Sequence, residues 1–242
     1  MTGLVWVILP TYNEADNLEI AVGAVLDGLA TAAPDGHRVL IVDDDSPDGT
    51  GALADRLAEA HDGTVEVLHR PSKRGLGRAY LAGFDCALHA GAALVVEMDA
   101  DLSHDPADLP RLLAAAESSD LVLGSRYVPG GQVLGWGPLR RTLSRGGSRY
   151  ARTILGLDVH DLTGGFKCFR REVLEAIDLP SVRSQGYAFQ VELTYRAVQR
   201  GFRVREIPIV FRDRRAGKSK MSGRIALEAV FRIPQIRVRD GA

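Results

Sequence analysis

The feature that most constrains the fold is a regular alternation of short apolar runs and longer amphipathic stretches over the first 125 residues. The apolar runs are rich in Val, Leu and Ile, as buried parallel strands are, and they lie at 4–9, 39–42, 65–68, 93–98 and 121–123. The amphipathic stretches, which predict helices, lie at about 14–32, 49–61, 75–90 and 106–118. This alternation predicts an α/β fold, with a doubly wound parallel sheet and helices on both faces.

The sequence also predicts where two of these helices begin and which elements follow in the second half of the chain. Asn13 is expected to cap the first helix and Pro106 to begin the fourth. After residue 125 the pattern predicts helices at 136–157, 188–200 and 222–238, strands at 165–169 and 202–211, and a basic loop at 212–220. No linker rich in Pro or Gly interrupts the chain, so we expect a single domain over 1–242.

Polar clusters follow three of the predicted strands. The first begins at Pro10, the second at Asp43 and the third at Asp99. Ligands of doubly wound sheets bind outside the carboxyl ends of the strands. We therefore expect these three clusters to converge on one edge of the sheet.

Asp99 and Asp101 flank a single residue directly after the fourth apolar run. In extended backbone, side chains two residues apart point the same way, so both carboxylates face one side of the strand end. They repel each other unless a cation lies between them, and hard carboxylate oxygens suit Mg²⁺ or Mn²⁺. The pattern predicts a site for Mg²⁺ or Mn²⁺. The alternative is a solvated loop whose aspartates cap the helix near residue 106.

The run 43–50, Asp-Asp-Asp-Ser-Pro-Asp-Gly-Thr, follows the second apolar run. An aspartate at such a strand end accepts hydrogen bonds from a ribose or a base edge in dinucleotide-binding folds. Alternatively, Asp48 or Ser46 caps the next helix. No G-x-G-x-x-G follows the first strand and no G-x-x-x-x-G-K-[ST] occurs, which disfavours a nicotinamide enzyme and a P-loop ATPase.

The net charge of −1 conceals a large asymmetry between the two halves. Residues 1–120 contain 7 Lys and Arg against 21 Asp and Glu, whereas residues 121–242 contain 23 against 10. An acidic half suits a bound cation, and a basic half suits phosphates, nucleic acid or a lipid surface. The alternative is that the two halves simply attract each other.

The basic half is rich in the residue types that bind phosphate. They include Arg126 after the fifth strand, Arg140 and Ser144 four residues apart on one helix face, and Arg214 and Lys220 in the basic loop. As a set they predict phosphate binding. We also expect the basic loop to close over an anion, because its like charges repel one another until the anion is bound.

Composition also bears on three questions: whether the chain binds nucleic acid, in which compartment it works and whether it spans a membrane. Aromatic residues make up only 6% of the chain, which argues against nucleic acid, whose sites usually interleave aromatic with basic side chains. The only two cysteines, Cys86 and Cys168, favour a reduced, cytoplasmic compartment. No uncharged apolar run approaches the ~18–20 residues of a membrane span.

From residue 4 to about 232 the chain resembles the inverting GT-A glycosyltransferases of family 2, and within them the dolichol-phosphate and polyprenol-phosphate mannose synthases. The resemblance rests on six motifs in the family's order and at similar distances. They are Pro-Thr-Tyr-Asn-Glu at 10–14, Val-Asp-Asp-Asp-Ser-Pro-Asp-Gly-Thr at 42–50, Met-Asp-Ala-Asp-Leu-Ser-His at 98–104, Gly-Ser-Arg-Tyr at 124–127, Gly-Gly-Phe-Lys at 164–167 and Phe-Arg-Asp-Arg-Arg-Ala-Gly-Lys-Ser-Lys-Met at 211–221.

The resemblance implies a role for the matching residues. Donor binding falls to Pro10, Tyr12, Glu14, Val42, Asp44, Asp99, Ala100, Asp101, Arg214 and Lys220. Binding of the acceptor phosphate falls to Arg126, Arg140 and Ser144, metal binding to Asp99, Asp101 and Ser103, and catalysis to Asp101 and Arg126. The family often has Gln where Ser103 stands, so a metal contact there is expected to be shorter or water-mediated. About 1–125 would be the nucleotide-sugar half and about 126–242 the acceptor half.

The reaction implied is the transfer of mannose from GDP-mannose to a polyprenyl (dolichyl-type) phosphate, with inversion at the sugar. A phosphate monoester is largely dianionic at pH 7, so such a nucleophile needs no general base. The alternatives are a UDP-glucose-dependent glucosyltransferase, another family 2 transferase, or a non-catalytic nucleotide- or nucleic-acid-binding module. The segments 136–157 and 222–238 mix apolar residues with arginines, so they either lie peripherally on the cytoplasmic face of a membrane or turn their apolar residues to the core.

Overall fold

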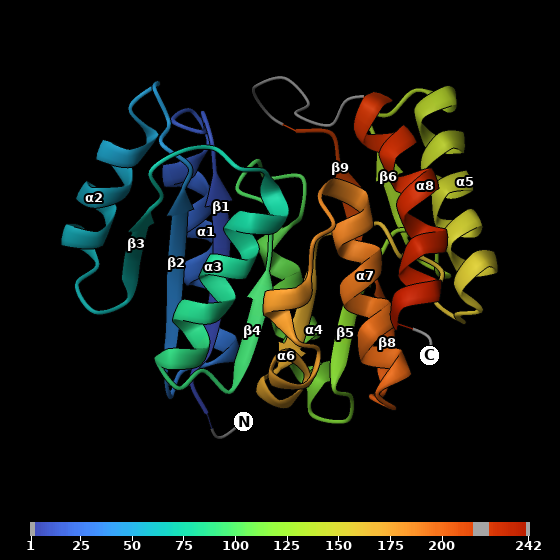
Figure 1. The fold of residues 1–242 in the computed structure, drawn as a ribbon. Helices are drawn as coiled ribbons and strands as arrows, with labels where there is room; N and C mark the ends of the chain where they lie inside the picture. Colours follow the sequence, from blue (N-terminus) through green and yellow to red (C-terminus); the bar gives the residue numbers. More distant parts are fainter. Residues whose placement is uncertain (1–2, 215–222, 241–242) are drawn as a thin grey trace.

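The computed structural model describes residues 3–214 and 223–240. Seven strands form one sheet, in the order β3-β2-β1-β4-β7-β5-β8 (Figure 1). Their bounds are β1 Val5–Thr11, β2 His37–Asp43, β3 Val65–His69, β4 Leu94–Glu97, β5 Leu121–Ser125, β7 Lys167–Arg170 and β8 Val204–Pro208. The first five coincide with the predicted apolar runs to within about two residues at each end, as expected for strands whose two faces are both covered.

Helices cover both faces of this sheet, as predicted. Their bounds are α1 Leu18–Ala32, α2 Thr50–Ala60, α3 Leu76–His89, α4 Leu109–Ala116, α5 Pro138–Leu155, α6 Arg171–Ala176, α7 Gly186–Gln199 and α8 Gly223–Asp240. Alternate side chains of β1 enter two separate cores. Val5 and Val7 pack with residues of α1, α2 and α4, whereas Trp6 and Ile8 pack with residues of α3, α5, α6, α7 and α8.

The start of the first helix differs from the prediction. Helix α1 begins at Leu18, so the expectation that Asn13 caps it is wrong. Asn13 instead has a left-handed φ of 56°, and its N–H donates to Ser46 Oγ at 3.1 Å. The N–H of Glu14 donates to Thr50 Oγ1 at 2.9 Å. These two bonds tie the loop after β1 to the loop after β2, so the first two polar clusters lie side by side.

Strand β7 makes the sheet mixed where the sequence pattern predicts parallel strands. It is antiparallel to both β4 and β5 and lies between them. The strand itself was expected at 165–169, and Cys168 is fully buried there. Because β7 and β8 come from the second half of the chain, the two halves share one sheet.

Helices α5 and α8 lie side by side at the β8 end of the molecule (Figure 1), and Tyr150 Oη donates to the Val230 carbonyl at 2.8 Å. A two-stranded ribbon of β6 (Gln132–Leu134) and β9 (Val210–Arg212) lies nearby. Within the described ranges, no helix combines the length and the apolar character that crossing a membrane requires.

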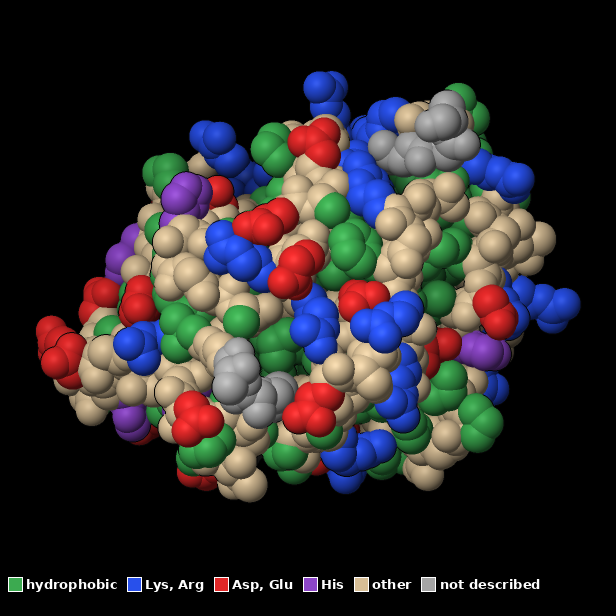
Figure 2. Space-filling view, turned by 90° about the horizontal axis from the view of Figure 1, so that it is seen from below, with side chains coloured by type: hydrophobic (Ala, Val, Ile, Leu, Met, Phe, Trp, Pro, Cys, Tyr) green, Lys and Arg blue, Asp and Glu red, His purple; other side chains and the backbone are tan. Residues whose placement is uncertain are grey.

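The charge asymmetry of the sequence is also a separation in space. Figure 2 views the edge at which β1 begins, and there Asp and Glu predominate at the left, where α2 lies. Lys and Arg become frequent toward the middle and right, while hydrophobic side chains are dispersed among the others. The acidic and basic halves therefore occupy different ends of the sheet.

Candidate active site

A cavity of about 240 Å³ opens where β1, β2 and β4 end. The three polar clusters meet there, as the sequence predicts. The wall contains Pro10 and Thr11 from the end of β1, Tyr12 and Glu14 from the loop after it, Asp44 from the loop after β2, Asp99, Ala100 and Asp101 from the loop after β4, and Arg214 from the segment after β9. Eight of the ten residues expected to bind the donor thus lie around one space.

The acidic run after β2 divides into structural and cavity-facing residues. Asp43 accepts hydrogen bonds from Thr11 Oγ1 at 3.1 Å and from Ser46 Oγ at 2.6 Å, which shapes the turn. Asp48 accepts the N–H of Thr50, the first residue of α2, at 3.0 Å, but the N-cap position itself is Gly49, so neither Asp48 nor Ser46 is the cap. Only Asp44 reaches the cavity, where it pairs with Arg70. Burial raises the pKa of Asp44 above its usual range, although Arg70 opposes the shift.

Asp99 and Asp101 project from the loop that follows β4. Asp99 Oδ1 accepts a hydrogen bond from Tyr80 Oη at 3.2 Å, and burial, with repulsion from Asp101, raises its pKa to about 7. Asp101 Oδ1 accepts the N–H of Ser103 at 3.1 Å, and its Oδ2 lies 3.2 Å from Arg214 Nη2. The turn at residue 106 is capped by Asp105, so the alternative that Asp99 or Asp101 caps it is wrong.

This pair of carboxylates fits a divalent cation. Arg214 already places positive charge against Asp101, whereas Asp99 accepts its hydrogen bond from the neutral hydroxyl of Tyr80. Among the described residues no three His, Cys, Asp or Glu side chains form a closed metal site. Mg²⁺ commonly takes one or two carboxylates and completes its coordination with water and substrate phosphates. Ser103 does not line the cavity, and its buried Oγ has no hydrogen-bond partner in the part described.

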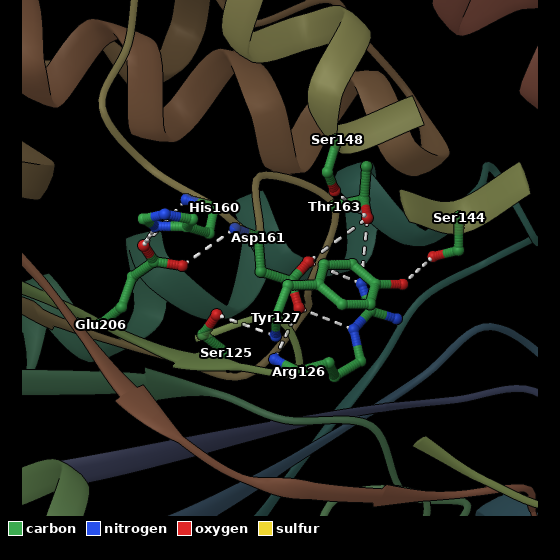
Figure 3. Close-up of polar contacts among 9 residues, drawn as sticks. All are labelled: Ser125, Arg126, Tyr127, Ser144, Ser148, His160, Asp161, Thr163 and Glu206. Atoms are coloured by element: carbon green, nitrogen blue, oxygen red, sulfur yellow. Dashed lines mark hydrogen bonds and ion pairs between the residues drawn. The ribbon is translucent and has the colours of Figure 1, made fainter. Parts of the chain in front are cut away.

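Arg126 lies in a buried network just after β5 (Figure 3). Its Nε and Nη2 each donate to Asp161 at 2.7 Å, and Nη2 also donates to Thr163 Oγ1 at 2.9 Å. Glu206 in turn accepts the N–H of Asp161 at 2.9 Å. Burial by itself would lower the pKa of Arg126, but Asp161 raises it above the ordinary value, and Arg126 likewise lowers the pKa of Asp161. Both side chains are therefore held in their charged forms.

The three residues expected to bind the acceptor phosphate are brought together through shared neighbours. Tyr127 follows Arg126 and donates its hydroxyl to Ser144 Oγ at 2.6 Å (Figure 3). The guanidinium carbons of Arg126 and Arg140 lie 5.7 and 4.1 Å from the centre of the Trp136 ring. Arg140, Ser144 and Arg126 lie outside the wall of the cavity.

One of the residues expected to bind the acceptor, Arg140, is linked to the cavity wall through two adjacent residues. Asp213 pairs with Arg140 at 3.0 Å, and the next residue, Arg214, pairs with Asp101. The N–H of Arg212 donates to the Ser103 carbonyl at 3.0 Å. The segment after β9 therefore touches both the paired carboxylates and the arginine of α5.

Two expected donor residues are not in the cavity wall. The side chain of Val42 is fully buried in the core that contains Ile8 and Phe84. Lys220 lies outside the described residues, as does the basic loop from residue 215 onward, so the expectation that this loop closes over an anion stays a prediction.

The cavity also has members that sequence reasoning missed. They are Lys73, Gly75, Leu76 and Ala79, together with Gln185 and Gly186 at the start of α7. The ammonium of Lys73 lies 3.7 Å from the centre of the Tyr12 ring. A signal for Lys73 existed, because residues 70–78 hold four of the seven basic residues in the acidic half. Nothing local marks Gln185 or Gly186.

Comparisons with known proteins agree with these observations. The model of glycosyl transferase family 2 matches residues 6–178. The chain is 53% identical over 234 residues to the polyprenol monophosphomannose synthase of Mycolicibacterium smegmatis, which covers 96% of this chain and 86% of the relative. It is 50% identical over 226 residues to the undecaprenyl-phosphate mannosyltransferase of Micrococcus luteus, covering 93% of this chain and 90% of the relative.

Solved structures share the fold. Glucosyl-3-phosphoglycerate synthase from Mycobacterium tuberculosis, in complex with Mn²⁺, uridine-diphosphate and glucosyl-3-phosphoglycerate, gives a TM-score of 0.70 at 20% identity over 99% of this chain and 81% of that chain. Its complex with Mg²⁺ and uridine-diphosphate gives 0.69 at 20% identity, over 99% and 80%. The architecture is GT-A, as the sequence predicts. With the matched family model and two relatives at about 50% identity over most of its length, this chain belongs to glycosyltransferase family 2.

Proposed function

We propose that this protein transfers mannose from GDP-mannose to a polyprenyl (dolichyl-type) phosphate, with inversion, giving β-linked polyprenyl-phosphate mannose and GDP. The observation that carries the proposal is the adjacency of a cavity with paired carboxylates and a cluster of arginines, joined through Asp213 and Arg214. The names of the two curated relatives support mannose as the sugar and a polyprenyl phosphate as the acceptor. The resemblance to the mannose synthases favours GDP-mannose as the donor.

The donor would lie in the cavity along the ends of the strands. Tyr12, Glu14 and Asp44, which line the cavity with Pro10, would contact the nucleoside. Asp99, Ala100 and Asp101 would contact the diphosphate, and Arg214, which lies beside Asp101, would pair with it. Val42 would support the nucleoside from the core beneath, because its side chain does not reach the wall.

Asp99 and Asp101 would hold Mg²⁺ or Mn²⁺, with the Ser103 N–H fixing the orientation of Asp101. The Mn²⁺ and Mg²⁺ complexes of the structural neighbour support a divalent metal. When bound, the cation stabilises the negative charge that develops on the departing diphosphate. A cation held here would favour the charged form of Asp99, whose pKa is raised to about 7 by burial and by repulsion from Asp101.

The acceptor phosphate would lie against Arg126, Arg140 and Ser144. Asp161 holds Arg126 in position and in its charged form, so this arginine would act as a preorganised hydrogen-bond donor to a dianionic nucleophile, while Arg140 would supply most of the positive charge. A dianion needs no general base, so these side chains would serve to align the acceptor phosphate for attack on the sugar from the side opposite the leaving group. Attack from that side inverts the configuration of the sugar.

We further propose that the protein works at a membrane surface, as one domain with a donor half and an acceptor half. Leu139 and Leu143 of α5 and Phe231 of α8 are 73%, 67% and 65% exposed on helices rich in arginine. Such a combination is typical of helices that lie on anionic lipid. The free thiols of Cys86 and Cys168 favour the cytoplasmic side.

The test is a transfer assay with polyprenyl phosphate in detergent, using GDP-mannose and UDP-glucose as donors and Asp101→Asn as the variant. We expect mannose transfer by the wild type, and a loss of about 100-fold or more in the variant, comparable to removing a transition-state charge stabiliser. Asp105→Asn is the matched control, because Asp105 caps the neighbouring turn outside the cavity.

Three results would contradict the proposal. Preference for UDP-glucose would overturn the donor, and full activity of Asp101→Asn without excess metal would overturn the metal assignment. A wild type that binds nucleotides but transfers nothing would favour a non-catalytic module.

A further inference from the structure

A second hollow, of about 550 Å³, lies beside α5 and apart from the donor cavity. Its wall contains three arginines of α5, with a tyrosine, a threonine and a histidine around them: Arg145, Arg149, Arg152, Tyr127, Thr153 and His160. None of these residues has a place in the reaction proposed above. The hollow adjoins the proposed acceptor residues, because Tyr127 also donates its hydroxyl to Ser144 (Figure 3).

Helix α5 concentrates positive charge on this side. It carries five arginines and no Asp or Glu. Arg141, Arg145 and Arg149 follow one another at intervals of four residues, so their side chains lie along one face of the helix. Like charges at this spacing destabilise a helix unless an opposite charge lies nearby.

The surrounding protein leaves most of this charge without a counter-charge. Among the residues whose side chains the structure describes, 3–214 and 229–239, no carboxylate pairs with Arg145 or Arg149, and the guanidinium of Arg145 lies 5.5 Å from the centre of the Tyr127 ring. Arg152 pairs with Asp158, whose side chain is 88% exposed, so solvent screens that pair.

The acidic groups next to the hollow are already engaged. Glu206 lies 3.0 Å from His160 Nδ1 and accepts a hydrogen bond from the N–H of Asp161. The carboxylate of Asp161 is in turn paired with Arg126. Figure 3 shows both carboxylates turned into this network. Neither is free to neutralise Arg145 or Arg149.

We propose that this hollow is a second anion-binding site, separate from the acceptor site, and that it takes the phosphate group of an anionic ligand. Guanidinium groups bind phosphate bidentately, and Thr153 supplies a hydroxyl donor in the same wall. The volume exceeds that of one phosphate and fits a phosphate carried on a larger group. Phosphate chemistry of this kind has two sources, the headgroup of an anionic membrane lipid and a free phosphate compound. The inference goes beyond the proposed function and does not depend on transferase activity.

The experiment compares wild type with the double variant Arg145→Gln/Arg149→Gln, without metal or nucleotide sugar. One arm measures the affinity for inorganic pyrophosphate by calorimetry. The other arm measures how much protein co-sediments with lipid vesicles. The vesicles consist of phosphatidylcholine alone or of phosphatidylcholine mixed with the anionic lipid phosphatidylglycerol. Arg56→Gln is the matched control, because Arg56 is an exposed helical arginine on α2 at the far end of the sheet. We expect the double variant to lose affinity by about tenfold or more for at least one probe, as for lost charge-assisted hydrogen bonds, and the control to lose none.

Loss confined to pyrophosphate assigns the site to a free phosphate compound, and loss with the phosphatidylglycerol vesicles assigns it to a lipid headgroup. An unchanged double variant, or an equal loss in Arg56→Gln, overturns the proposal. A second measurement needs no variant. Phenylglyoxal modification of the wild type, mapped by mass spectrometry, should show that the effective probe protects Arg145 and Arg149 but not Arg56. Absence of that protection also overturns it.

Discussion

At the scale of single residues, the most consequential pair is Arg126 and Asp161. Both side chains are buried, and the arginine donates two hydrogen bonds of 2.7 Å to the carboxylate. Desolvation of two charges offsets much of their attraction, so the pair is better understood as a way of holding Arg126 in position than as a source of stability. Removing one partner is a different matter, because the other is left buried and charged.

We therefore expect Asp161→Asn to lower the free energy of unfolding by about 3–5 kcal/mol. The control Thr163→Val removes one hydrogen bond to the same guanidinium and keeps the ion pair, so it should cost about 1 kcal/mol. Urea denaturation of both variants measures the difference. Equal effects of the two substitutions would show that the charge on Asp161 is unimportant.

His104 provides a prediction of pH dependence. Its ring stacks on Phe166 and meets Phe211 edge-on, with both ring centres 5.3 Å away. Burial lowers the pKa of His104 to about 4, with Asp101 and Asp161 opposing the shift and Arg126 adding to it. The folded state therefore binds fewer protons than the unfolded state between about pH 4 and pH 6.5, and stability falls as the pH drops through this window.

Replacing His104 with Phe should flatten that dependence. We expect the free energy of unfolding of His104→Phe to change less than that of the wild type between pH 6.5 and pH 4, while other groups still titrate. Denaturation curves across this range provide the measurement. The same slope in both proteins would mean that His104 is protonated in the folded state.

At the scale of elements, the ion pair between α5 and the segment after β9 is expected to matter for acceptor binding and not for folding stability. Arg140 and Asp213 form an ion pair whose side chains are 42% and 40% exposed, so the pair contributes less than about 1 kcal/mol to folding. Arg140→Ala should leave the melting temperature nearly unchanged. It should raise KM for the polyprenyl phosphate by roughly 10- to 100-fold, the loss of one charge-assisted contact.

Donor affinity supplies the internal control for that variant, because Arg140 does not line the donor cavity. Asp213→Asn is the matched substitution on the other side of the pair. This substitution removes the carboxylate that pairs with Arg140 and should not weaken binding of the acceptor. Equal loss of donor and acceptor affinity in Arg140→Ala would contradict the proposed division between the two sites.

At the scale of the whole molecule, the two halves are joined by a buried ion pair within the sheet. Glu97 of β4 and Lys167 of β7 lie 3.6 Å apart with no exposed surface, and Lys167 Nζ also donates to the Gln190 carbonyl at 2.8 Å. Burial raises the pKa of Glu97 to about 7 and lowers that of Lys167 to about 8. Neither charge is tolerated there without the other.

A double-mutant cycle tests this junction. Lys167→Met should destabilise the protein by about 3–5 kcal/mol, because Glu97 loses its partner in a water-free core. The double variant Glu97→Met/Lys167→Met should recover much of that loss, since two apolar side chains of similar length need no compensation. Chemical denaturation of the four proteins yields the coupling energy. A double variant as unstable as the sum of the two single variants would show that the charges do not interact.

The sequence by itself determined those features that depend on local pattern. Strands β1 to β5 follow from apolar runs whose two faces are both covered, and the meeting of Pro10, Asp44 and Asp99 follows from the rule that parallel strands end on the same edge. Asp99 and Asp101 both line the cavity wall, as their spacing predicts, although the chain forms a turn at 100–101 and Ala100 lines the wall as well.

Only the tertiary structure decided which distant groups became partners. The antiparallel placement of β7, the pairing of Arg126 with a residue 35 positions away and the entry of Gln185 into the cavity wall have no local signature. Periodicity reports whether a side chain is buried, but it carries no information about which other segment buries it. That choice depends on how strands far apart in the chain pair, and so on the free energy of the complete fold.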